Sequence, residues 1–359
     1  MDCPECERFE ECIFDVTDIY LKFPLPFTCS KVLTYLGRSG LPFEARSDAS
    51  ARVTVPRGSV RKFLTELGGC MTDEELAATR VLTMPAGTVP QLDDFGRVLP
   101  LSRLVAVDQA SWIQQMLDAR NYKSMFQPMF SPDGKLVAVE ALFRASDENG
   151  TAISPGYLFD LARAANMSFQ VDLAARRSAV TMAAAAKLQD LQLFINFNPT
   201  SIYDPSYCLR TTVSTLEDLG FRPAGVVFEV TESDRVTNLD HLKGILAFYR
   251  RSGFKIALDD VGAGYSGLNL LNDLRPDYIK IDMHLIRGVD TDVYRQSIVG
   301  HIVGIAKDNG VNIVAEGIES DGELAWLKTQ GIDLAQGYLL SRPVDAGAVR
   351  AAAAPLKTA

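Results

Sequence analysis

The chain has 359 residues, 47% hydrophobic and 23% charged, which is an ordinary composition for a globular protein and a length that favours two domains. Its net charge of −9 argues against a general nucleic-acid binder, although bound cations could still let it take a small phosphorylated ligand. No run approaches the roughly 18 apolar residues that span a bilayer, and the acidic N-terminus is unlike a signal peptide, so we expect a cytoplasmic protein with no membrane segment.

Cysteines concentrate at the N-terminus, where five of the six lie within the first 70 residues. Tetrahedral zinc takes four nitrogen or sulfur ligands, and all three histidines lie far downstream. The spacing does not form a paired CxxC set, so free thiols with a packing role and redox sensing stay open beside zinc. The residues that a structural Zn²⁺ would use are Cys3, Cys6, Cys12 and Cys29.

The first hundred residues predict a small α+β domain without a visible catalytic constellation. A Pro/Gly/Asp-rich connection, Pro85–Pro100, follows it and places the domain boundary near residue 105, so that the domains are 1–104 and 105–359. The expected extended segments are Asp18–Phe23 and Phe43–Val55, and the expected helices are Ser30–Arg38, Arg57–Leu67 and Thr72–Thr79, the last opened by a capping-box pattern.

From Met125 onward, short apolar strands alternate with amphipathic helices, which predicts a parallel sheet with helices outside it. Eight strands in about 240 residues fit a (β/α)8 barrel. The expected strands are Met125–Phe130, Leu136–Arg144, Leu191–Phe197, Gly225–Thr231, Phe254–Asp260, Tyr278–Asp282, Val311–Glu316 and Ile332–Leu339. The helices between them include Gly156–Asn166, Leu173–Leu188, Leu239–Ser252, Val293–Asn309 and Gly322–Gln330.

The first two of these strands are joined only by the turn Ser131–Lys135. Parallel neighbours need a crossover of a dozen or more residues, so a connection this short forces an antiparallel pair. We therefore expect a TIM-like barrel whose first strand is antiparallel.

Polar side chains stand at the ends of seven successive strands. In such barrels the carboxyl ends of the strands form the active site. A single Asp at a strand end is often only a helix cap, but Asp259 and Asp260 are in tandem before a glycine-rich turn. We expect the strand-end residues to converge on one site: Glu140, Asn196, Glu229, Asp259 with Asp260, Lys280, Glu316 and Gln336.

Carboxylates and an amide oxygen, with no His or Cys, suit hard cations such as Mg²⁺ or Mn²⁺. Several carboxylates and one lysine are the residues that two-metal hydrolysis of a phosphoester uses. In this reaction two cations stabilise the attacking water and the leaving oxygen. The tandem aspartates are well placed for this: one aspartate can bind both cations as a bridge, and the other can bind the second cation.

These residues resemble the EAL-domain family of cyclic di-GMP phosphodiesterases over residues 110–350, in order throughout. Glu140-Ala141-Leu142 is the tripeptide that names the family, and ALDDVGAGYSGL around Asp259 is a second family motif. The other matching segments are Phe126-Gln127-Pro128, Glu229–Glu232, Tyr278–Asp282, Val314–Glu319 and Ala335–Pro343.

The resemblance implies hydrolysis of one phosphodiester of cyclic di-GMP to linear pGpG, two Mg²⁺ or Mn²⁺ ions per site, and a homodimer through the barrel. It implies that Lys280 positions or activates the attacking water, and that Glu316 acts as general base or helps to hold the second metal. The implied ligands of the metals are Glu140, Asn196, Glu229, Asp259 and Asp260. The implied substrate contacts are Gln127, Leu142, Arg144, Asp172, Glu319 and Gln336, and Glu232 would support the loop after Asp260.

The chain departs from the family pattern mainly in that loop, where Val261, Ala263 and Gly267 replace the commoner Phe, Thr and Ser. The substitutions put the catalytic rate in doubt more than the chemistry. The alternative function is a catalytically silent receptor that binds cyclic di-GMP and relays its occupancy to a partner. The first hundred residues match no family that we recognise.

Overall fold

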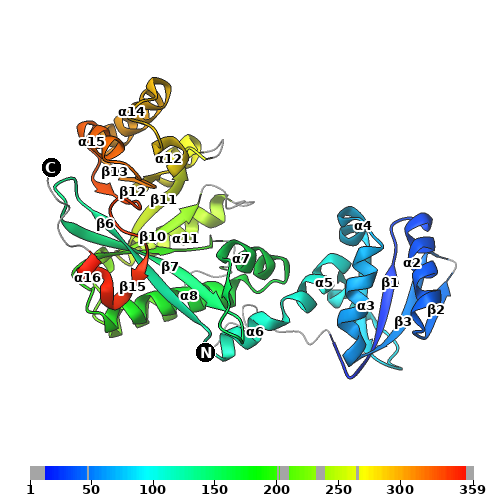
Figure 1. Ribbon diagram of the computed structural model, residues 1–359. Coiled ribbons are helices and arrows are strands. Elements are labelled where there is room, and N and C mark those ends of the chain that lie inside the picture. The colour runs from blue at the N-terminus through cyan, green and yellow to red at the C-terminus, as the bar shows by residue number, and fades with distance from the viewer. Residues whose placement is uncertain are drawn as a thin grey trace. The chain divides into compact units, whose positions relative to one another are not determined.

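The computed structural model describes residues 13–46, 48–199, 202, 210–231, 239–263 and 267–352. These residues form two compact units, each with its own β-sheet (Figure 1). The N-terminal unit runs to Arg120 and also includes Ile153–Ser168, while the second unit holds Asn121–Ala152 and the chain from Phe169 onward. Within the described residues, no helix has both the length and the hydropathy that crossing a bilayer requires.

The N-terminal unit is built on a five-stranded antiparallel sheet with the order β2-β3-β1-β4-β5. Its strands are β1 (Val16–Lys22), β2 (Phe43–Arg46), β3 (Ser50–Pro56), β4 (Arg80–Pro85) and β5 (Leu99–Pro100). Its helices are α2 (Pro26–Ser39), α3 (Arg57–Gly69), α4 (Asp73–Ala78), the 3-10 helix η1 (Leu92–Arg97), α5 (Leu101–Gln109), α6 (Ser111–Asp118) and α7 (Pro155–Ala164).

One face of this sheet is apolar because alternate strand residues point to it. Ile19 and Leu21 of β1 and Val53 of β3 are buried against Val32 of α2 and Phe63 of α3. The opposite face carries the polar residues of the same strands. The small α+β domain predicted from the sequence is thus confirmed as an antiparallel sheet with helices on one side.

Two details of this unit differ from the sequence prediction. The stretch Phe43–Val55 is not one extended segment but a hairpin of β2 and β3, which turns where Ala49 has a φ of +57°. The connection Pro85–Pro100 also contains structure, since β5 at its end pairs with β4. The capping box is present as predicted: the Thr72 hydroxyl accepts from the Glu75 amide, and the Glu75 carboxylate accepts from the Thr72 amide.

The second unit is an eight-stranded barrel, with two short strands added at its edges. The barrel strands are β6 (Tyr122–Phe130), β7 (Leu136–Ser146), β9 (Gln192–Asn196), β10 (Val226–Thr231), β11 (Lys255–Val261), β12 (Tyr278–Ile281), β13 (Asn312–Ala315) and β14 (Leu334–Ala335). The added strands are β8 (Ala152–Ile153) and β15 (Val344–Asp345). β6 is antiparallel to both β7 and β14, and the other neighbours are parallel, so the predicted barrel with a reversed first strand is confirmed.

Helices connect the parallel strands. They are α8 (Ser168–Ala185), α10 (Arg210–Asp218), α11 (Leu239–Arg251), α12 (Gly267–Leu274), α13 (Met283–Ile286), α14 (Val293–Asp308), α15 (Asp321–Gln330) and α16 (Val349–Ala352), with 3-10 turns η3 (Pro223–Gly225) and η4 (Ala346–Ala348). The bounds of α11, α14 and α15 lie within one residue of those predicted, whereas α8 begins five residues before the predicted Leu173.

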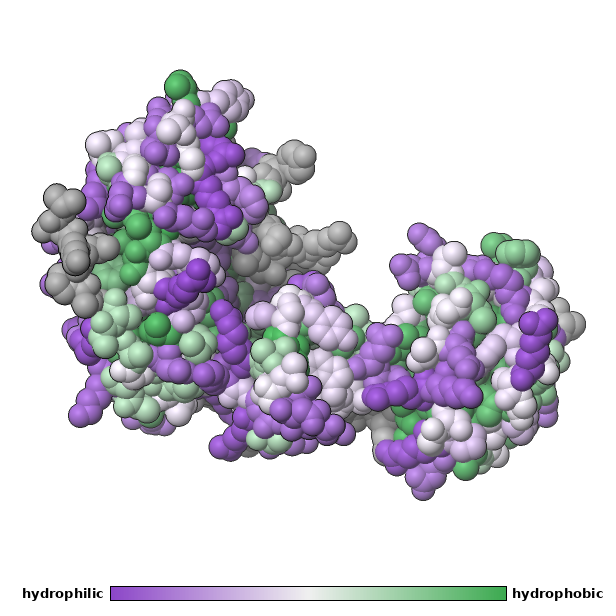
Figure 2. Space-filling view, in the orientation of Figure 1, coloured by the Kyte–Doolittle hydropathy of each residue, from purple (hydrophilic) through white to green (hydrophobic). Residues whose placement is uncertain are grey.

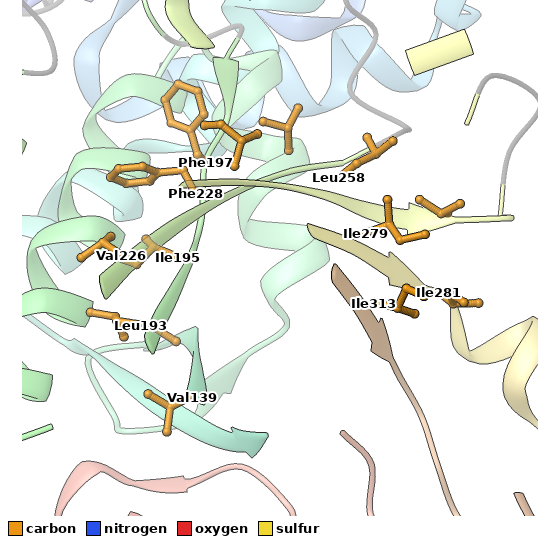
Figure 3. Close-up of a cluster of buried hydrophobic side chains, with 14 of the residues drawn as sticks. Val139, Leu193, Ile195, Phe197, Val226, Phe228, Leu258, Ile279, Ile281 and Ile313 are labelled. Carbon is orange, nitrogen blue, oxygen red and sulfur yellow. The ribbon is translucent and has the colours of Figure 1, made fainter. Parts of the chain in front are cut away.

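Strand residues of the barrel divide between two apolar layers. Outward-facing side chains such as Val139, Ile195, Phe228 and Ile279 form the layer between strands and helices (Figure 3). Inward-facing side chains fill the barrel interior: Met129, Ala138, Phe194, Val227, Ala257, Tyr278, Val314 and Leu334. Outside these layers the visible surface of the protein is largely hydrophilic (Figure 2).

Candidate active site

The polar site stands directly on the inward-facing apolar layer of the barrel. Side chains of a strand alternate between its two faces, so the residue two positions further points inward as well. Glu140 follows Ala138 in this way, and Glu229 follows Val227. Five more polar residues lie two positions after an inward-facing apolar residue in the same way: Asn196, Asp259, Lys280, Glu316 and Gln336. On the reversed strand β6, Gln127 lies two residues before Met129.

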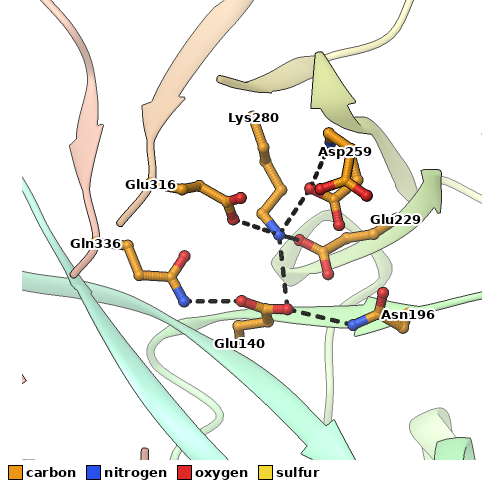
Figure 4. Close-up of polar contacts among 8 residues, drawn as sticks. Glu140, Asn196, Glu229, Asp259, Lys280, Glu316 and Gln336 are labelled. Atoms are coloured by element: carbon orange, nitrogen blue, oxygen red, sulfur yellow. Dashed lines mark hydrogen bonds and ion pairs between the residues drawn. The ribbon is translucent and has the colours of Figure 1, made fainter. Parts of the chain in front are cut away.

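Lys280 of β12 is the centre of this cluster, and its side chain is 1% exposed (Figure 4). Its Nζ lies 2.7 Å from Glu316 Oε1, 2.8 Å from Glu229 Oε1 and 3.1 Å from Asp259 Oδ1. Glu140 Oε1 is slightly further away, at 3.6 Å. One buried cation is therefore shared by four carboxylates that come from four other strands.

Glu140 is held by amides on both sides. Gln336 Nε2 donates to Glu140 Oε2 at 2.7 Å, and Asn196 Nδ2 donates to Glu140 Oε1 at 3.2 Å. Gln336 is placed by a close approach of backbones, because a Cβ on the next residue, Gly337, would lie 2.1 Å from the carbonyl oxygen of Ile318. Only glycine fits there.

The tandem aspartates reach the same site because β11 is irregular. Adjacent residues of a regular strand point to opposite faces, but the pairing of β11 with β12 shifts register between Leu258 and Val261. Asp260 takes a φ of +57°, which is uncommon for a residue other than glycine, and its amide donates to Asp259 Oδ1 at 2.9 Å. Carboxylate oxygens of Asp259, Asp260 and Glu316 consequently lie within 4.8 Å of one another.

Burial and crowding shift the pKa values of these groups. Burial raises the pKa of Glu316 to about 8 and that of Asp260 to about 6, with Asp259 adding to both. Burial also raises the pKa of Glu229 well above its usual value, despite the attraction of Lys280. For Lys280, burial alone would lower the pKa, but the four carboxylates together raise it well above its ordinary value and keep it charged.

The donor set fits divalent cations with a preference for oxygen. One lysine cannot neutralise five carboxylates in a buried site, and uncompensated buried charge is costly. Glu229 Oε2 and Gln336 Oε1 are buried and have no hydrogen-bond partner among the described residues. Unpaired oxygens beside a group of three convergent carboxylates are what a site for a hard cation offers.

A cavity of about 350 Å³ opens above the cluster. Of the predicted substrate contacts, Gln127, Glu319 and Gln336 line it, whereas Leu142, Arg144 and Asp172 are not among its lining residues. Four residues outside the predicted set also line the cavity: Asp282, Met283, Arg287 and Tyr338. The spacing Lys280-Ile281-Asp282 could have indicated Asp282, since it continues the inward alternation, but Arg287 lies beyond the strand, where no periodicity applies.

Asp172 instead belongs to a buried network beside the site. Its Oδ2 lies 2.9 Å from Arg176 Nη2, and both side chains are at most 5% exposed. Its Oδ1 accepts from the Asn198 amide at 3.2 Å, so the pair contacts the backbone just after β9 and Asn196. Arg176 also lies over the ring of Phe197.

Several predicted residues lie outside the described part of the chain or away from the barrel. Glu232, Cys3, Cys6 and Cys12 are outside the described residues. Cys29 lies on α2 in the core of the N-terminal unit, where burial raises the pKa of its thiol. The zinc hypothesis therefore stays a prediction.

Comparison with known proteins gives one family match, the EAL domain, over residues 110–343. Among curated relatives, the probable cyclic di-GMP phosphodiesterase PdeG of Escherichia coli is 32% identical over 61% of this chain and 44% of its own length. The blue light- and temperature-regulated antirepressor BluF of the same organism is 28% identical over 60% of this chain and 53% of its own length. The chain thus spans about half or less of the length of these relatives.

The solved structures with a similar fold include one from Vibrio cholerae and one from Klebsiella pneumoniae. A standalone EAL protein of Vibrio cholerae, in its form bound to c-di-GMP, is 35% identical, covers 63% of this chain and 93% of its own, and has a TM-score of 0.57. BlrP1 of Klebsiella pneumoniae, in a complex with manganese and cyclic di-GMP, is 25% identical, with 92% of this chain and 96% of its own covered and a TM-score of 0.57.

Proposed function

The chain belongs to the EAL domain family, and from that membership we propose that it hydrolyses cyclic di-GMP to linear pGpG with the help of two Mg²⁺ or Mn²⁺ ions. The observation that carries the proposal is the complete set of strand-end donors around Lys280, with five carboxylates and no gap in the set. A relative is named as a probable phosphodiesterase for the same dinucleotide, and another relative was solved with manganese and that ligand.

We assign the cations to the oxygens of the site as follows. One set consists of Glu140, Asn196, Glu229 and Asp259, and a second set consists of Asp259 and Asp260, with Glu316 close by. When bound, such cations supply a lowered pKa for water and stabilisation of the charge on the leaving oxygen. They also offset the repulsion between an acidic site and a ligand that carries two phosphodiesters.

The chain's own side chains provide positioning and proton transfer. Glu316 is the proposed proton acceptor, and it lies at the cavity wall beside Lys280. Lys280 Nζ donates toward three carboxylates at once and so fixes their positions. Its proposed role in the reaction is to orient the attacking water once cations hold those carboxylates. Gln127, Glu319 and Gln336 are proposed to contact the dinucleotide along the cavity, and Leu142, Arg144 and Asp172 are retained as proposed contacts from the family motifs.

The test is hydrolysis by the purified chain in Mn²⁺ or Mg²⁺, followed by chromatography of the nucleotides. We expect pGpG to appear, and we expect Glu140→Ala to abolish its formation and weaken cation binding, because Glu140 supplies ligand oxygens and is fixed by two amides. Glu148→Ala, which removes an exposed carboxylate shortly after β7, is the matched control and should leave the rate unchanged. Normal turnover in Glu140→Ala would refute the assignment.

The second candidate is a receptor that binds cyclic di-GMP without hydrolysing it. It is favoured by the relative that is named as an antirepressor. Saturable binding of cyclic di-GMP with no pGpG in either cation would establish this alternative. In either case we propose a homodimer through the barrel, which light scattering after size-exclusion chromatography tests directly.

A further inference from the structure

The N-terminal sheet has an open face with cations aligned across its strands. Cross-strand pairing places Arg46 of β2 opposite Ser50 of β3, Ser50 opposite Lys22 of β1, and Lys22 opposite Arg80 of β4. The helix-covered face holds the alternate residues, such as Leu21 and Ala51. One row across this face therefore carries three cationic side chains and a hydroxyl.

This row borders a cavity of about 180 Å³, which we call the basic groove. Its cationic lining residues are Lys22, Arg46, Arg52 and Arg80, and Tyr20, Leu82 and Val98 supply apolar surface. None of its lining residues is a carboxylate. In a chain with a net charge of −9, four cations around one cavity are a local concentration of positive charge, although Asp48, Glu44 and Asp18 pair with two of them and offset part of it.

The cations of the basic groove differ in how they are paired. Lys22 Nζ lies 3.1 Å from Asp48 Oδ2, and Arg52 Nη2 lies 2.7 Å from Glu44 Oε1. Within the described residues, neither Arg46 nor Arg80 has an ion pair. Arg80 Nη1 donates to the Ala77 carbonyl at 3.3 Å, which leaves its other N–H groups for a ligand. Guanidinium is the side-chain group best suited to bind phosphate in a bidentate way.

We propose that the basic groove binds the phosphate group of a small organic phosphate. Adjacent strands are about 4.8 Å apart, so Arg46 and Arg80 flank Lys22 from strands about 14 Å apart, and their long side chains can converge on one phosphate between them. Leu82, Val98 and the ring of Tyr20 form the apolar surface for the organic part. The cavity of about 180 Å³ has room for the phosphate and for part of the group attached to it, and the rest of that group would lie on the open face of the sheet. This inference does not depend on the chemistry of the barrel.

The test is isothermal titration of the full chain at low ionic strength in EDTA, with inorganic phosphate, guanosine 5′-monophosphate and guanosine as probes. Without divalent cations the acidic barrel site repels phosphate, so binding reports on the groove. We expect the monophosphate to bind more tightly than inorganic phosphate, and guanosine not to bind. Added salt should weaken the binding.

The double substitution Arg46→Gln/Arg80→Gln should weaken binding about tenfold or more, since it removes two charge-assisted contacts. Arg46→Lys/Arg80→Lys should retain part of the affinity, because it keeps the charge. Lys62→Gln/Arg103→Gln removes two exposed charges elsewhere in the same unit and serves as the matched control. Thermal unfolding of each variant checks that it is folded.

Four results would overturn the proposal. The first is the absence of saturable binding for both phosphate probes. The second is an affinity that the Gln substitutions leave unchanged. The third is guanosine binding as tightly as its monophosphate. The fourth is binding of a single-stranded oligonucleotide in place of the small phosphates, which would make the open sheet a nucleic-acid surface.

Discussion

Lys280 has two separable effects on the barrel site. Its charge neutralises part of the surrounding carboxylate charge, and its Nζ also occupies a central position among the proposed catalytic groups. We expect Lys280→Met to lower the rate of cyclic di-GMP hydrolysis by a factor of about 100 or more, because a positioned donor is lost. We expect Mn²⁺ affinity to be unchanged or higher, because a repelling cation is removed. Turnover assays and Mn²⁺ titration measure the two effects separately.

Lys255→Met is the control for this substitution. Lys255 lies at the start of β11, with its Nζ 3.3 Å from the Tyr278 hydroxyl, so the change removes the same charge away from the strand ends that form the site. It should preserve turnover. Loss of Mn²⁺ binding in Lys280→Met would contradict the view that this lysine opposes the cations.

The raised pKa values of Glu316, about 8, and Asp260, about 6, make cation binding depend on pH. Unfolded carboxylates ionise near pH 4, so between about pH 4 and 8 the cation-free folded chain binds more protons here than the unfolded chain. The contribution of these groups to the free energy of unfolding consequently falls as pH rises through that window. A bound cation requires the ionised forms and reverses this effect.

We therefore expect Mn²⁺ to raise the thermal unfolding midpoint more at pH 8 than at pH 6, with an affinity at least about tenfold higher at pH 8. Calorimetric titration in buffers of different ionisation enthalpy should also detect proton release at pH 7. Glu316→Gln removes the carboxyl group whose pKa is raised to about 8 and should flatten the dependence. An equal affinity at both pH values would show that the carboxylates are already ionised without the cation.

At the scale of elements, the buried pair of Asp172 and Arg176 joins α8 to the end of β9. The pair supports the Asn198 amide, two residues after Asn196. Asp172→Asn leaves the buried guanidinium without its counter-charge, which typically costs about 3–5 kcal/mol. We expect a loss of that size in urea denaturation of the full chain, together with weaker Mn²⁺ binding from a displaced Asn196.

Asp190→Asn provides the comparison. Asp190 pairs with Arg350 at 2.5 Å, but their side chains are 62% and 52% exposed. Solvent screens such a pair, so its loss should change stability by about 0–1 kcal/mol. Equal costs for Asp172→Asn and Asp190→Asn would mean that the buried pair does not support α8.

The elements that could be predicted from the sequence are those marked by a clear local pattern, such as an apolar run or a short turn. The barrel strands are short apolar runs, and the reversed β6 follows from the length of the turn Ser131–Lys135, as confirmed by its antiparallel pairing. The hairpin of β2 and β3 was missed because its turn lacks the usual Asn-Gly or Asp-Gly pair and instead places Ala49 at positive φ. β14 is shorter than predicted, because after Ala335 the chain turns closely around Gly337.

The same limit applies to the site. Strand-end residues could be selected because strand alternation fixes which side chains point inward, and the structure brings Glu140, Lys280 and Glu316 together. Arg287 could not be selected, because its place at the cavity depends on the short helix α13 that follows β12, and Arg287 caps the end of that helix. The inward position of both Asp259 and Asp260 also needed the register shift, which no periodic pattern encodes.

For the molecule as a whole, the helix α5 belongs to the N-terminal unit, which continues beyond it to Arg120. The predicted boundary near residue 105 lies inside this helix, and Leu101 and Leu104 of α5 are fully buried in the core of the N-terminal unit. Beyond residue 105, Arg61 Nη2 donates to Ser111 Oγ at 2.8 Å, and Ile113 is buried. We therefore propose that residues past the predicted boundary stabilise the unit before it.

We expect a fragment of residues 1–120 to unfold about 10 °C or more above a fragment of residues 1–104. Truncation at 104 leaves α5 with only its first turn, so Leu101 and Leu104 are no longer held in place. Fully burying one leucine is worth about 1.5–3 kcal/mol, and 1 kcal/mol corresponds to about 4–8 °C in a domain of this size. Circular dichroism melts of the two fragments measure the difference.

Leu104→Ala in the 1–120 fragment tests the same packing of α5 against the core without shortening the fragment. It should cost about 2–5 kcal/mol, as large-to-small substitutions in a core do. Arg103→Ala alters the exposed neighbour and should have little effect. If both fragments melted together and Leu104→Ala were silent, α5 would be dispensable to the N-terminal core. If they differ as expected, a fragment that is to contain the intact N-terminal unit must include all of α5, because a cut at residue 105 removes most of that helix.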